Sequence, residues 1–510
     1  MDSRPFRPRN IVFILTDDQG AWALGCAGNA EIRTPRLDAL AAGGVRFDNF
    51  FCTSPVCSPA RASLMTGRIP SQHGIHDWLQ SGNYVLPAEH PLRQQSWFAQ
   101  RDDAAIDYLA GMRCYTDDLA DAGYTCGLAG KWHLGNTGVP QHGFSFWDVI
   151  PWGGSGYQDA LMLTDGALRV EPGYLTDVIT DKALGFLDGQ TGDKPFYLSV
   201  HYNAPHTPWD GNNHPEELTG LYRDCPFTTC PEYPRPHPWQ VSSCSFGTGE
   251  RRRELLSGYY GAISGVDRNV GRLIDKLAAM QVLDETLIIF TSDNGMNTGH
   301  HGCWGKGNAT FPQNMYEESV KVPFIVSCPA LIPGGRVESR LLSQYDLLPT
   351  ICAFAGLAAP AAADLPGQSF LPLLLGEAMA GEEQVVIYDE YGPTRMIRTR
   401  EWKYVHRYVY GPHELYDLVN DPGEEHNLID AAAQQPRVQA MRAALHDWFV
   451  RYADPDRDGS TLPVTGAGQT RLVGRDGKGE TAFASTVRYV LDWEGTLGET
   501  VQFYSAPERR

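Results

Sequence analysis

The segment that begins at Cys57 joins a nucleophilic side chain to a predicted helix start. It reads Cys57-Ser58-Pro59-Ala60-Arg61 and continues to Thr66-Gly67. Serine favours the cap of a helix and proline its first turn, which puts Cys57 at the positive end of the helix dipole, where an anion is stabilised. Arg61 follows one turn later and can reach back toward position 57. An isolated cysteine beside a helix cap is more often a buried structural residue, so its role depends on the groups near it.

Two polar pairs follow two apolar segments of the chain. Asp17-Asp18 comes directly after the β-branched run 10–16, and Asp293-Asn294 comes after the run 286–292. Three carboxylates and one amide oxygen form a ligand set that suits Ca²⁺ or Mg²⁺ better than zinc. Asp and Asn also favour the turns that end strands. Because both pairs close predicted buried strands, the pattern favours a divalent cation site.

Cationic and imidazole side chains occupy three further short segments. Lys131 and His133 lie in Gly-Lys-Trp-His-Leu-Gly, His206 in Ala-Pro-His-Thr-Pro and Lys306 in Gly-Lys-Gly. Each of them taken singly is more often a solvated loop residue. The chain carries 42 Lys+Arg against 61 Asp+Glu, a formal net charge of −19, so an anionic substrate requires such local cations. The same charge argues against partners that are nucleic acids or anionic membranes.

The elements that must position these groups alternate between strands and helices. The apolar runs 10–16, 196–200 and 286–292 predict strands that are buried on both faces. Residues 34–43 predict a helix with Thr34 as its cap, and apolar residues recur at helical spacing from 259 to 277. We therefore expect an α/β fold with a large, mainly parallel central sheet sandwiched by helices. Ligands of such sheets bind beyond the carboxyl ends of the strands, where both polar pairs fall.

The chain changes character after about residue 375. Short strand-like runs at 384–389, 396–400, 402–410 and 412–418, followed by an amphipathic segment 437–450, predict a smaller C-terminal domain built on an antiparallel sheet and a helix. We predict a catalytic domain over 1–375, with an insertion loop at 207–250 that shapes the cleft, and a C-terminal subdomain over 376–510. The tail beyond 454 is expected to wrap the domain or to form a homo-oligomer contact.

The N-terminal residues and the cysteines bear on location. The first apolar stretch, 11–15, is too short for a membrane span or for the apolar core of a secretory signal. The chain has eleven cysteines, and an odd number fits reduced thiols better than a complete set of disulfides. We therefore expect a cytoplasmic protein. Cys225, Cys230 and Cys244 match no common zinc spacing, and free thiols are the better interpretation.

Taken together, the motifs resemble those of the type I sulfatases of the alkaline phosphatase superfamily. The family motifs are Cys-x-Pro-x-Arg followed by a helix and Thr-Gly, and the resemblance extends over about residues 8–430. It implies that a maturation enzyme oxidises Cys57 to formylglycine (3-oxoalanine). It also implies one divalent metal ion, usually Ca²⁺, with Mg²⁺ and Mn²⁺ as alternatives. Its ligands would be Asp17, Asp18, Asp293 and Asn294.

The resemblance further implies a mechanism for cleaving a sulfate monoester. One hydroxyl of the hydrated aldehyde, deprotonated with help from Asp293, attacks sulfur. His206, with Lys306, protonates the leaving alkoxide, and His133 takes the proton of the second hydroxyl so that sulfate departs. The implied catalytic residues are Cys57, Arg61, Lys131, His133, His206 and Lys306. The implied substrate contacts are Lys131, His133, His206, Lys306 and His301, although for His301 a structural role is equally open.

The predicted substrate is a sulfated carbohydrate or a small aryl or alkyl sulfate. Two alternatives remain open at this point: a phosphonate monoester or phosphodiester hydrolase of the same superfamily, and a non-catalytic binder of sulfated ligands. Tryptophans close to the motifs in sequence could form stacking walls for a sugar or aryl group, although most tryptophans simply pack in the interior. They are Trp78, Trp97, Trp152, Trp209 and Trp304.

Overall fold

The fold is described from a computed structural model of the 510-residue chain. Among the residues that the structure describes, no helix is both long and apolar enough to cross a membrane. Trp97 lies outside these residues. The described residues are 9–94, 104–241, 244–358, 364–379, 386–478, 481–484, 488–491 and 497–501.

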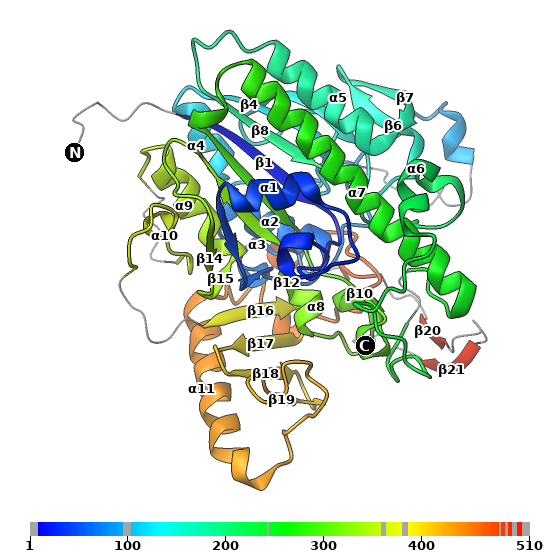
Figure 1. Ribbon diagram of the computed structural model, residues 1–510. Coiled ribbons are helices and arrows are strands. Elements are labelled where there is room, and N and C mark those ends of the chain that lie inside the picture. Colours follow the sequence, from blue (N-terminus) through cyan, green and yellow to red (C-terminus); the bar gives the residue numbers. More distant parts are fainter. Residues whose placement is uncertain are drawn as a thin grey trace.

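A ten-stranded sheet forms the centre of the molecule (Figure 1). The strands from β9 to β5 run parallel, whereas β13, β6 and β7 pair antiparallel with their neighbours. The predicted strands 10–16, 196–200 and 286–292 are confirmed, as is the mainly parallel sheet. In spatial order the strands are β14 (Arg336–Glu338), β2 (Val45–Phe47), β13 (Phe324–Ser327), β9 (Thr286–Ser292), β1 (Asn10–Thr16), β8 (Phe196–His201), β4 (Thr125–Lys131), β5 (Phe144–Ile150), β6 (Gln158–Thr164) and β7 (Ala167–Tyr174).

Helices cover both faces of this sheet because both faces of its central strands are apolar. In β1, Ile11, Phe13 and Leu15 belong to one buried cluster and Val12 and Ile14 to the other. Fully burying one such side chain contributes roughly 1.5–3 kcal/mol. Figure 1 shows α5 and α7 side by side across one face. One cluster includes residues of α1 (Pro35–Ala42), α5 (Leu175–Asp188) and α7 (Gly249–Ala279); the other includes α2 (Cys57–Thr66), α4 (Tyr115–Asp121) and α9 (Leu347–Phe354).

Two predicted helices differ in detail from the sequence expectation. Helix α1 is present, with Leu37 and Leu40 buried, but Thr34 does not cap it through its side chain. Its hydroxyl accepts a hydrogen bond from the Gly25 amide and donates one to the Asp38 carboxylate instead. Helix α7 begins ten residues before the predicted start at 259, because Leu255 and Leu256 extend its buried face.

A smaller antiparallel sheet forms the C-terminal region, as predicted. Its order is β16 (Ile387–Tyr391), β17 (Thr394–Arg398), β18 (Trp402–Arg407) and β19 (Glu414–Asp417). Helix α11 (Gln435–Tyr452) packs Met441, Leu445 and Phe449 onto this sheet, and Figure 1 shows the pair below the central sheet. The predicted fold class is therefore confirmed, whereas the boundary at residue 375 stays a prediction.

The remaining elements are short. Residues 207–250, predicted as an insertion loop, hold the helix α6 (Glu216–Thr219) and 3₁₀ turns, and the tail holds 3₁₀ turns at Gly459–Thr461 and Gly474–Gly477. The other strands are β3 (Phe50–Phe51), β10 (Asn297–Thr298), β11 (Trp304–Gly305), β12 (Lys321–Val322), β15 (Leu342–Ser343), β20 (Arg488–Leu491) and β21 (Leu497–Val501). The other helices are α3 (Pro70–His73), α8 (Glu317–Val320) and α10 (Leu371–Leu374).

Candidate active site

The polar pairs meet at one edge of the central sheet. Strands β1 and β9 are parallel neighbours with Thr16 opposite Ser292, so the residues that follow them emerge side by side. Asp17-Asp18 follows Thr16, and Asp293-Asn294 follows Ser292. The sheet therefore brings together the four predicted metal ligands, although Asp18 and Asp293 are 275 residues apart in the chain. No long side chain has to reach across.

The three carboxylates form a buried cluster. One oxygen from each of Asp17, Asp18 and Asp293 lies within 4.8 Å of the others, and all three residues are nearly inaccessible to solvent. Asp18 has a φ of 65°, a left-handed conformation that is uncommon for a residue other than glycine. Its amide donates to Asp293 Oδ1 at 3.2 Å. Burial and the charge of Asp17 raise the pKa of Asp293 to about 7.

The donor atoms of this cluster fit a hard divalent cation. Three carboxylates in one buried place repel each other unless a cation balances them. Among the described residues, Asn294 Oδ1 is buried and accepts no hydrogen bond, so it is free to complete an all-oxygen ligand set. Such a set suits Ca²⁺ or Mg²⁺. The chemistry of the residues therefore agrees with the predicted metal site.

Cys57 is the first residue of α2 and lies against this cluster. Its Sγ is 3.3 Å from Asp17 Oδ1 and 2.8 Å from Lys306 Nζ. Burial and the charge of Asp17 raise the pKa of the thiol to about 12, which disfavours a free thiolate nucleophile at neutral pH. The sulfur marks the place that the oxygens of an oxidised side chain would take. Position 57 thus lies at the helix start, as predicted.

The capping prediction for this helix is wrong in one respect. Val56, not Ser58, is the cap residue, and it has an extended backbone with φ −157° and ψ 147°. Ser58 therefore lies within the first turn, and its hydroxyl accepts a hydrogen bond from the Leu79 amide at 3.0 Å. The serine fixes a neighbouring loop rather than the helix end.

Three buried cations surround the carboxylates. Arg61 Nε donates to Asp293 Oδ2 at 2.8 Å, and its Nη1 donates to the Lys131 carbonyl at 2.9 Å. Lys131, the last residue of β4, forms an ion pair with Asp17, and Lys306 forms one with Asp18. Although burial opposes its charge, the neighbouring anions raise the pKa of Lys306 well above its usual value. We give the name charged centre to the three cations, Cys57 and the four predicted metal ligands. Its residues are Arg61, Lys131, Lys306, Cys57, Asp17, Asp18, Asp293 and Asn294.

The two predicted catalytic histidines have different surroundings. His133 is buried, its Nε2 lies 3.0 Å from the Leu79 carbonyl, and its Nδ1 has no hydrogen-bond partner among the described residues. Since a carbonyl can only accept, Nε2 carries the proton and Nδ1 can act as a base. Burial and the charge of Lys131 hold the pKa of His133 well below its usual value. His206 lies partly open to the pocket, with Nδ1 2.6 Å from the Thr207 carbonyl and Nε2 3.7 Å from Asp18 Oδ2.

His301 does not join these residues. Its Nε2 lies 3.0 Å from Glu318 Oε2 and its ring stacks on Tyr316 with centroids 3.8 Å apart. It is not one of the residues that line the pocket around Cys57. The structure thus favours the structural alternative for His301, and its predicted contact with substrate has no support in this geometry.

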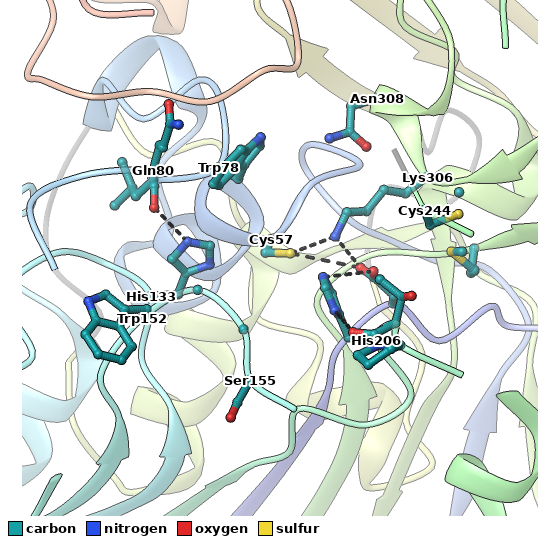
Figure 2. A pocket seen from close by; sticks show the side chains of 18 of the residues that line it. Cys57, Trp78, Gln80, His133, Trp152, Ser155, His206, Cys244, Lys306 and Asn308 are labelled. Carbon is teal, nitrogen blue, oxygen red and sulfur yellow. Dashed lines mark hydrogen bonds and ion pairs between the residues drawn. The ribbon is translucent and has the colours of Figure 1, made fainter. Parts of the chain in front are cut away.

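A cavity of about 560 Å³ opens onto Cys57, His133, His206 and Lys306. Figure 2 shows Trp78, Gln80 and Asn308 on one side of it and Ser155 on another. We call Trp78, Gln80 and Asn308 the pocket wall. Of these three residues, only Trp78 was expected near the site from the sequence. Asn308 follows Lys306 by two residues, and no motif in the sequence indicates a role for Gln80. Trp152 also lines the cavity, whereas Trp209 and Trp304 pack in a separate buried cluster.

The cysteines are consistent with the expectation of free thiols. Cys225 and Cys230 are free thiols. Cys225 and Cys230 pack beside a buried aromatic cluster, and Cys230 Sγ accepts a hydrogen bond from Thr298 Oγ1 at 3.1 Å. Cys244 lines the cavity. Among the described residues, these three cysteines do not form one of the groupings that could hold a metal ion.

The site combines a buried carboxylate cluster that could hold a metal ion, surrounding cations and a cysteine at a helix start. This combination defines a hydrolase of anionic esters. The model of the sulfatase family matches residues 9–357, and a model described as "N-sulphoglucosamine sulphohydrolase, C-terminal" matches residues 299–450. The chain therefore belongs to the sulfatase family, within the alkaline phosphatase superfamily, and is a sulfuric ester hydrolase.

Similar proteins act on chemically different esters. The chain is 26% identical to an N-acetylglucosamine-6-O-sulfatase of Bacteroides thetaiotaomicron, over 88% of each chain, and 30% identical to human arylsulfatase A, over 86% of this chain and 87% of the relative. A protein solved in complex with its substrate D-glucosamine-2-N,6-O-disulfate has a TM-score of 0.72 and 24% identity, over 89% of this chain and 99% of the other. This last likeness shows the fold alone.

Proposed function

We propose that the protein hydrolyses the sulfate monoester of a sugar, with Cys57 converted to formylglycine and a divalent cation, Ca²⁺ in the first place, held by Asp17, Asp18, Asp293 and Asn294. The observation that carries the proposal is the place of Cys57: its Sγ lies between Asp17 Oδ1 at 3.3 Å and Lys306 Nζ at 2.8 Å, at the first residue of a helix. A nucleophile at this position would lie beside the divalent cation held by Asp17 and beside Lys306, which would face the negative charge of the sulfate.

Formylglycine would supply a hydrated aldehyde as nucleophile, and the cation would polarise the sulfate and favour the ionised hydroxyl. The chain's own residues would do the rest. Arg61 orients Asp293 through its 2.8 Å hydrogen bond, and Lys131 and Lys306 offset the negative charge of the carboxylates so that a sulfate can approach. Two anions repel each other, so this neutralisation is the largest contribution that the site has to make.

The two histidines divide the proton transfers. His206 faces the cavity; because its Nδ1 donates to the Thr207 carbonyl, its Nε2 carries a proton only in the imidazolium form, and that proton can pass to the leaving alkoxide as a general acid. His133 holds its proton on Nε2 against the Leu79 carbonyl at 3.0 Å, which leaves Nδ1 as a base for the step that releases sulfate.

The cavity lining supports a sugar as leaving group. Trp78 and Trp152 offer flat apolar faces, and Gln80, Asn83 and Asn308 offer amide groups, around a cavity of about 560 Å³. Sugars present apolar ring faces and polar hydroxyls, which these side chains complement. The N-acetylglucosamine-6-O-sulfatase among the relatives points the same way.

Two measurements test the proposed function. The protein is produced with a formylglycine-generating enzyme, and the peptide that contains Cys57 is examined by mass spectrometry for conversion to the aldehyde. Turnover is then compared on hexosamine sulfates, 4-nitrophenyl sulfate and an aryl phosphonate monoester. Faster turnover of the phosphonate would favour the phosphonate hydrolase, and an unmodified thiol without turnover, despite the maturation enzyme, would favour a binder of sulfated ligands. The predicted cytoplasmic location and tail-mediated oligomer remain predictions.

A further inference from the structure

The segment Val464–Gln469, which we call the strap, runs along the pocket wall from outside the regions matched by the family models. Its backbone pairs with the loop that carries Trp78: Gln469 N donates to the Trp78 carbonyl at 2.8 Å, and Gln80 N donates to the Gln469 carbonyl at 2.9 Å. Figure 2 shows the orange-red ribbon of this part of the chain passing above Gln80 and Trp78. The tail thus adds a backbone layer behind the pocket.

One carbonyl of the strap holds two side chains of the pocket wall. Trp78 Nε1 donates to the Gly466 carbonyl at 3.1 Å, and Asn308 Nδ2 donates to the same oxygen at 3.3 Å. Trp78 and Asn308 are 230 residues apart in the chain and share this one acceptor. Gly466 has a φ of 78°, and a Cβ there would lie 2.9 Å from Asn308 Cβ.

The strap also supports the loop 74–80, which contacts Ser58 and His133. The side chain of Gln469 is fully buried; its Oε1 accepts from the His76 amide at 2.8 Å and its Nε2 donates to the Gly74 carbonyl at 2.9 Å. Within this loop, Leu79 donates to Ser58 Oγ and its carbonyl faces His133 Nε2, both at 3.0 Å. Ser58 itself lies in α2 and His133 follows β4, whereas the indole and amide of the wall share the strap.

We propose that the strap is a positioning element that fixes Trp78 and Asn308 for the sugar of the ester, and thereby sets which leaving groups the enzyme accepts. This rests on the proposed function. An indole held by its N–H keeps one ring orientation at the cavity, and the Asn308 side chain, held by its NH₂ on the same carbonyl, fixes the adjoining part of the wall. The sulfate itself contacts the charged centre and gains nothing from the strap.

The test variant is Gly466→Ala, whose added methyl group must displace the strap or Asn308. KM and kcat are measured on glucosamine 6-sulfate, or on the hexose sulfate that the wild type cleaves best, and Ki is measured for inorganic sulfate. We expect KM for the sugar sulfate to rise by about tenfold, with kcat and the Ki of sulfate within about twofold, the pattern of lost binding energy to the leaving group. Arg475→Ala, an exposed residue of the same tail with 87% of its side chain accessible, is the control and should change none of the three.

Equal changes in KM and in the Ki of sulfate, or no change in either, would overturn the positioning role while leaving the proposed function intact. A wild type that cleaves no sulfate ester contradicts the proposed function instead. If Gly466→Ala does not fold, Trp78→Phe decides, because the smaller phenyl ring keeps an aromatic face and lacks the indole N–H that donates to the Gly466 carbonyl. A KM for the sugar sulfate equal to that of the wild type in Trp78→Phe would then refute the proposal.

Discussion

The two sides of the cavity are built by different means. The charged centre comes mostly from residues directly at the ends of β1, β4 and β9 and in the first turns of α2, so the central sheet and this helix fix it; Lys306, which follows β11, is the exception. The pocket wall comes from loops that hold their shape through contacts with the strap, in which Gly466 lies 388 residues from Trp78 and 158 residues from Asn308. Reaction chemistry here depends on the core of the fold, and discrimination between esters depends on a peripheral segment that can change without disturbing that core.

The largest expected effect breaks the charged centre alone. Cys57→Ala removes the proposed nucleophile, and we expect turnover of every sulfate ester to fall by about 10⁴-fold or more, with no recovery at high substrate concentration. Steady-state assays on two esters with different leaving groups measure this. Cys225→Ala, at a half-buried cysteine outside the cavity lining, serves as the control and should retain activity. Full activity in Cys57→Ser would remove formylglycine from the mechanism.

Removal of the metal should come next in size. Dialysis of the mature enzyme against a chelator is expected to lower kcat by about 100-fold, because the polarisation of the sulfate and of the attacking hydroxyl that the ion would supply is lost. Ca²⁺ added back at about 100 times its Kd should restore activity and stabilise the fold by about 2.7 kcal/mol. Thermal unfolding supplies this second readout. Asp293→Asn should weaken the Ca²⁺-dependent shift in Tm, and an unaltered shift would place the cation elsewhere.

Arg61 connects the charged centre to the stability of the fold. Its side chain is 2% exposed and its partner Asp293 is fully buried, so Arg61→Ala leaves a buried carboxylate without its cation and should lower the free energy of unfolding by about 3–5 kcal/mol. Arg113 pairs with Asp118 and Asp121 at the surface, with 58% of its side chain exposed. Arg113→Ala should cost less than about 1 kcal/mol. Urea unfolding of both variants checks the contrast, and equal losses would contradict it.

The smallest effect sharpens the limits of both regions. Glu318→Gln removes the anion beside His301, whose hydrogen bond and charge outweigh burial and raise the pKa of that imidazole. We expect the His301 pKa to fall, measured by NMR of the ring protons, and kcat and KM to stay within about twofold, because His301 lies outside the cavity. A clear rise in KM would return His301 to the substrate site.

The same pair gives a pH dependence with a defined sign. The pKa of His301 is raised in the folded protein. The stability that this imidazole contributes is therefore complete below its ordinary pKa of 6.5 and is lost as the pH rises through its pKa in the folded state. Despite burial, the hydrogen bond from His301 lowers the pKa of Glu318 to about 2, so its contribution is complete above 4.5 and lost toward pH 2. The stability difference between wild type and Glu318→Gln should therefore be greatest between pH 4.5 and 6.5, at about 1 kcal/mol. Thermal melts across this range measure it.

The fold could be predicted where local patterns decide it. The apolar runs at 10–16 and 286–292 can only be strands buried on both faces, and the polar pairs after them had to meet once those strands were neighbours. The position of Cys57 beside them was implied by motif resemblance and is consistent with the geometry. Local propensity failed for Ser58, whereas Thr34 is the cap residue of α1 as predicted but makes no side-chain cap hydrogen bond; each hydroxyl found a partner in another segment.

The pocket wall could not be predicted, since its order depends on contacts between distant segments. Nothing in the sequence around Gln80 or Asn308 indicates that Gly466 or Gln469 lies behind them, and the tail has no periodic pattern that would predict its path. His301 illustrates the opposite case. A motif-like neighbourhood left substrate contact open beside a structural role, but Nε2 of His301 is hydrogen-bonded to Glu318 and its ring is stacked on Tyr316.

Gly153 limits how this pocket could be redesigned. A Cβ at this position would lie 2.2 Å from His133 Nε2, so any other amino acid would push the imidazole away from the Leu79 carbonyl that orients it. Libraries intended to broaden the range of accepted esters should therefore leave this position untouched and vary the tail instead, except at Gln469, which supports the loop that carries Leu79.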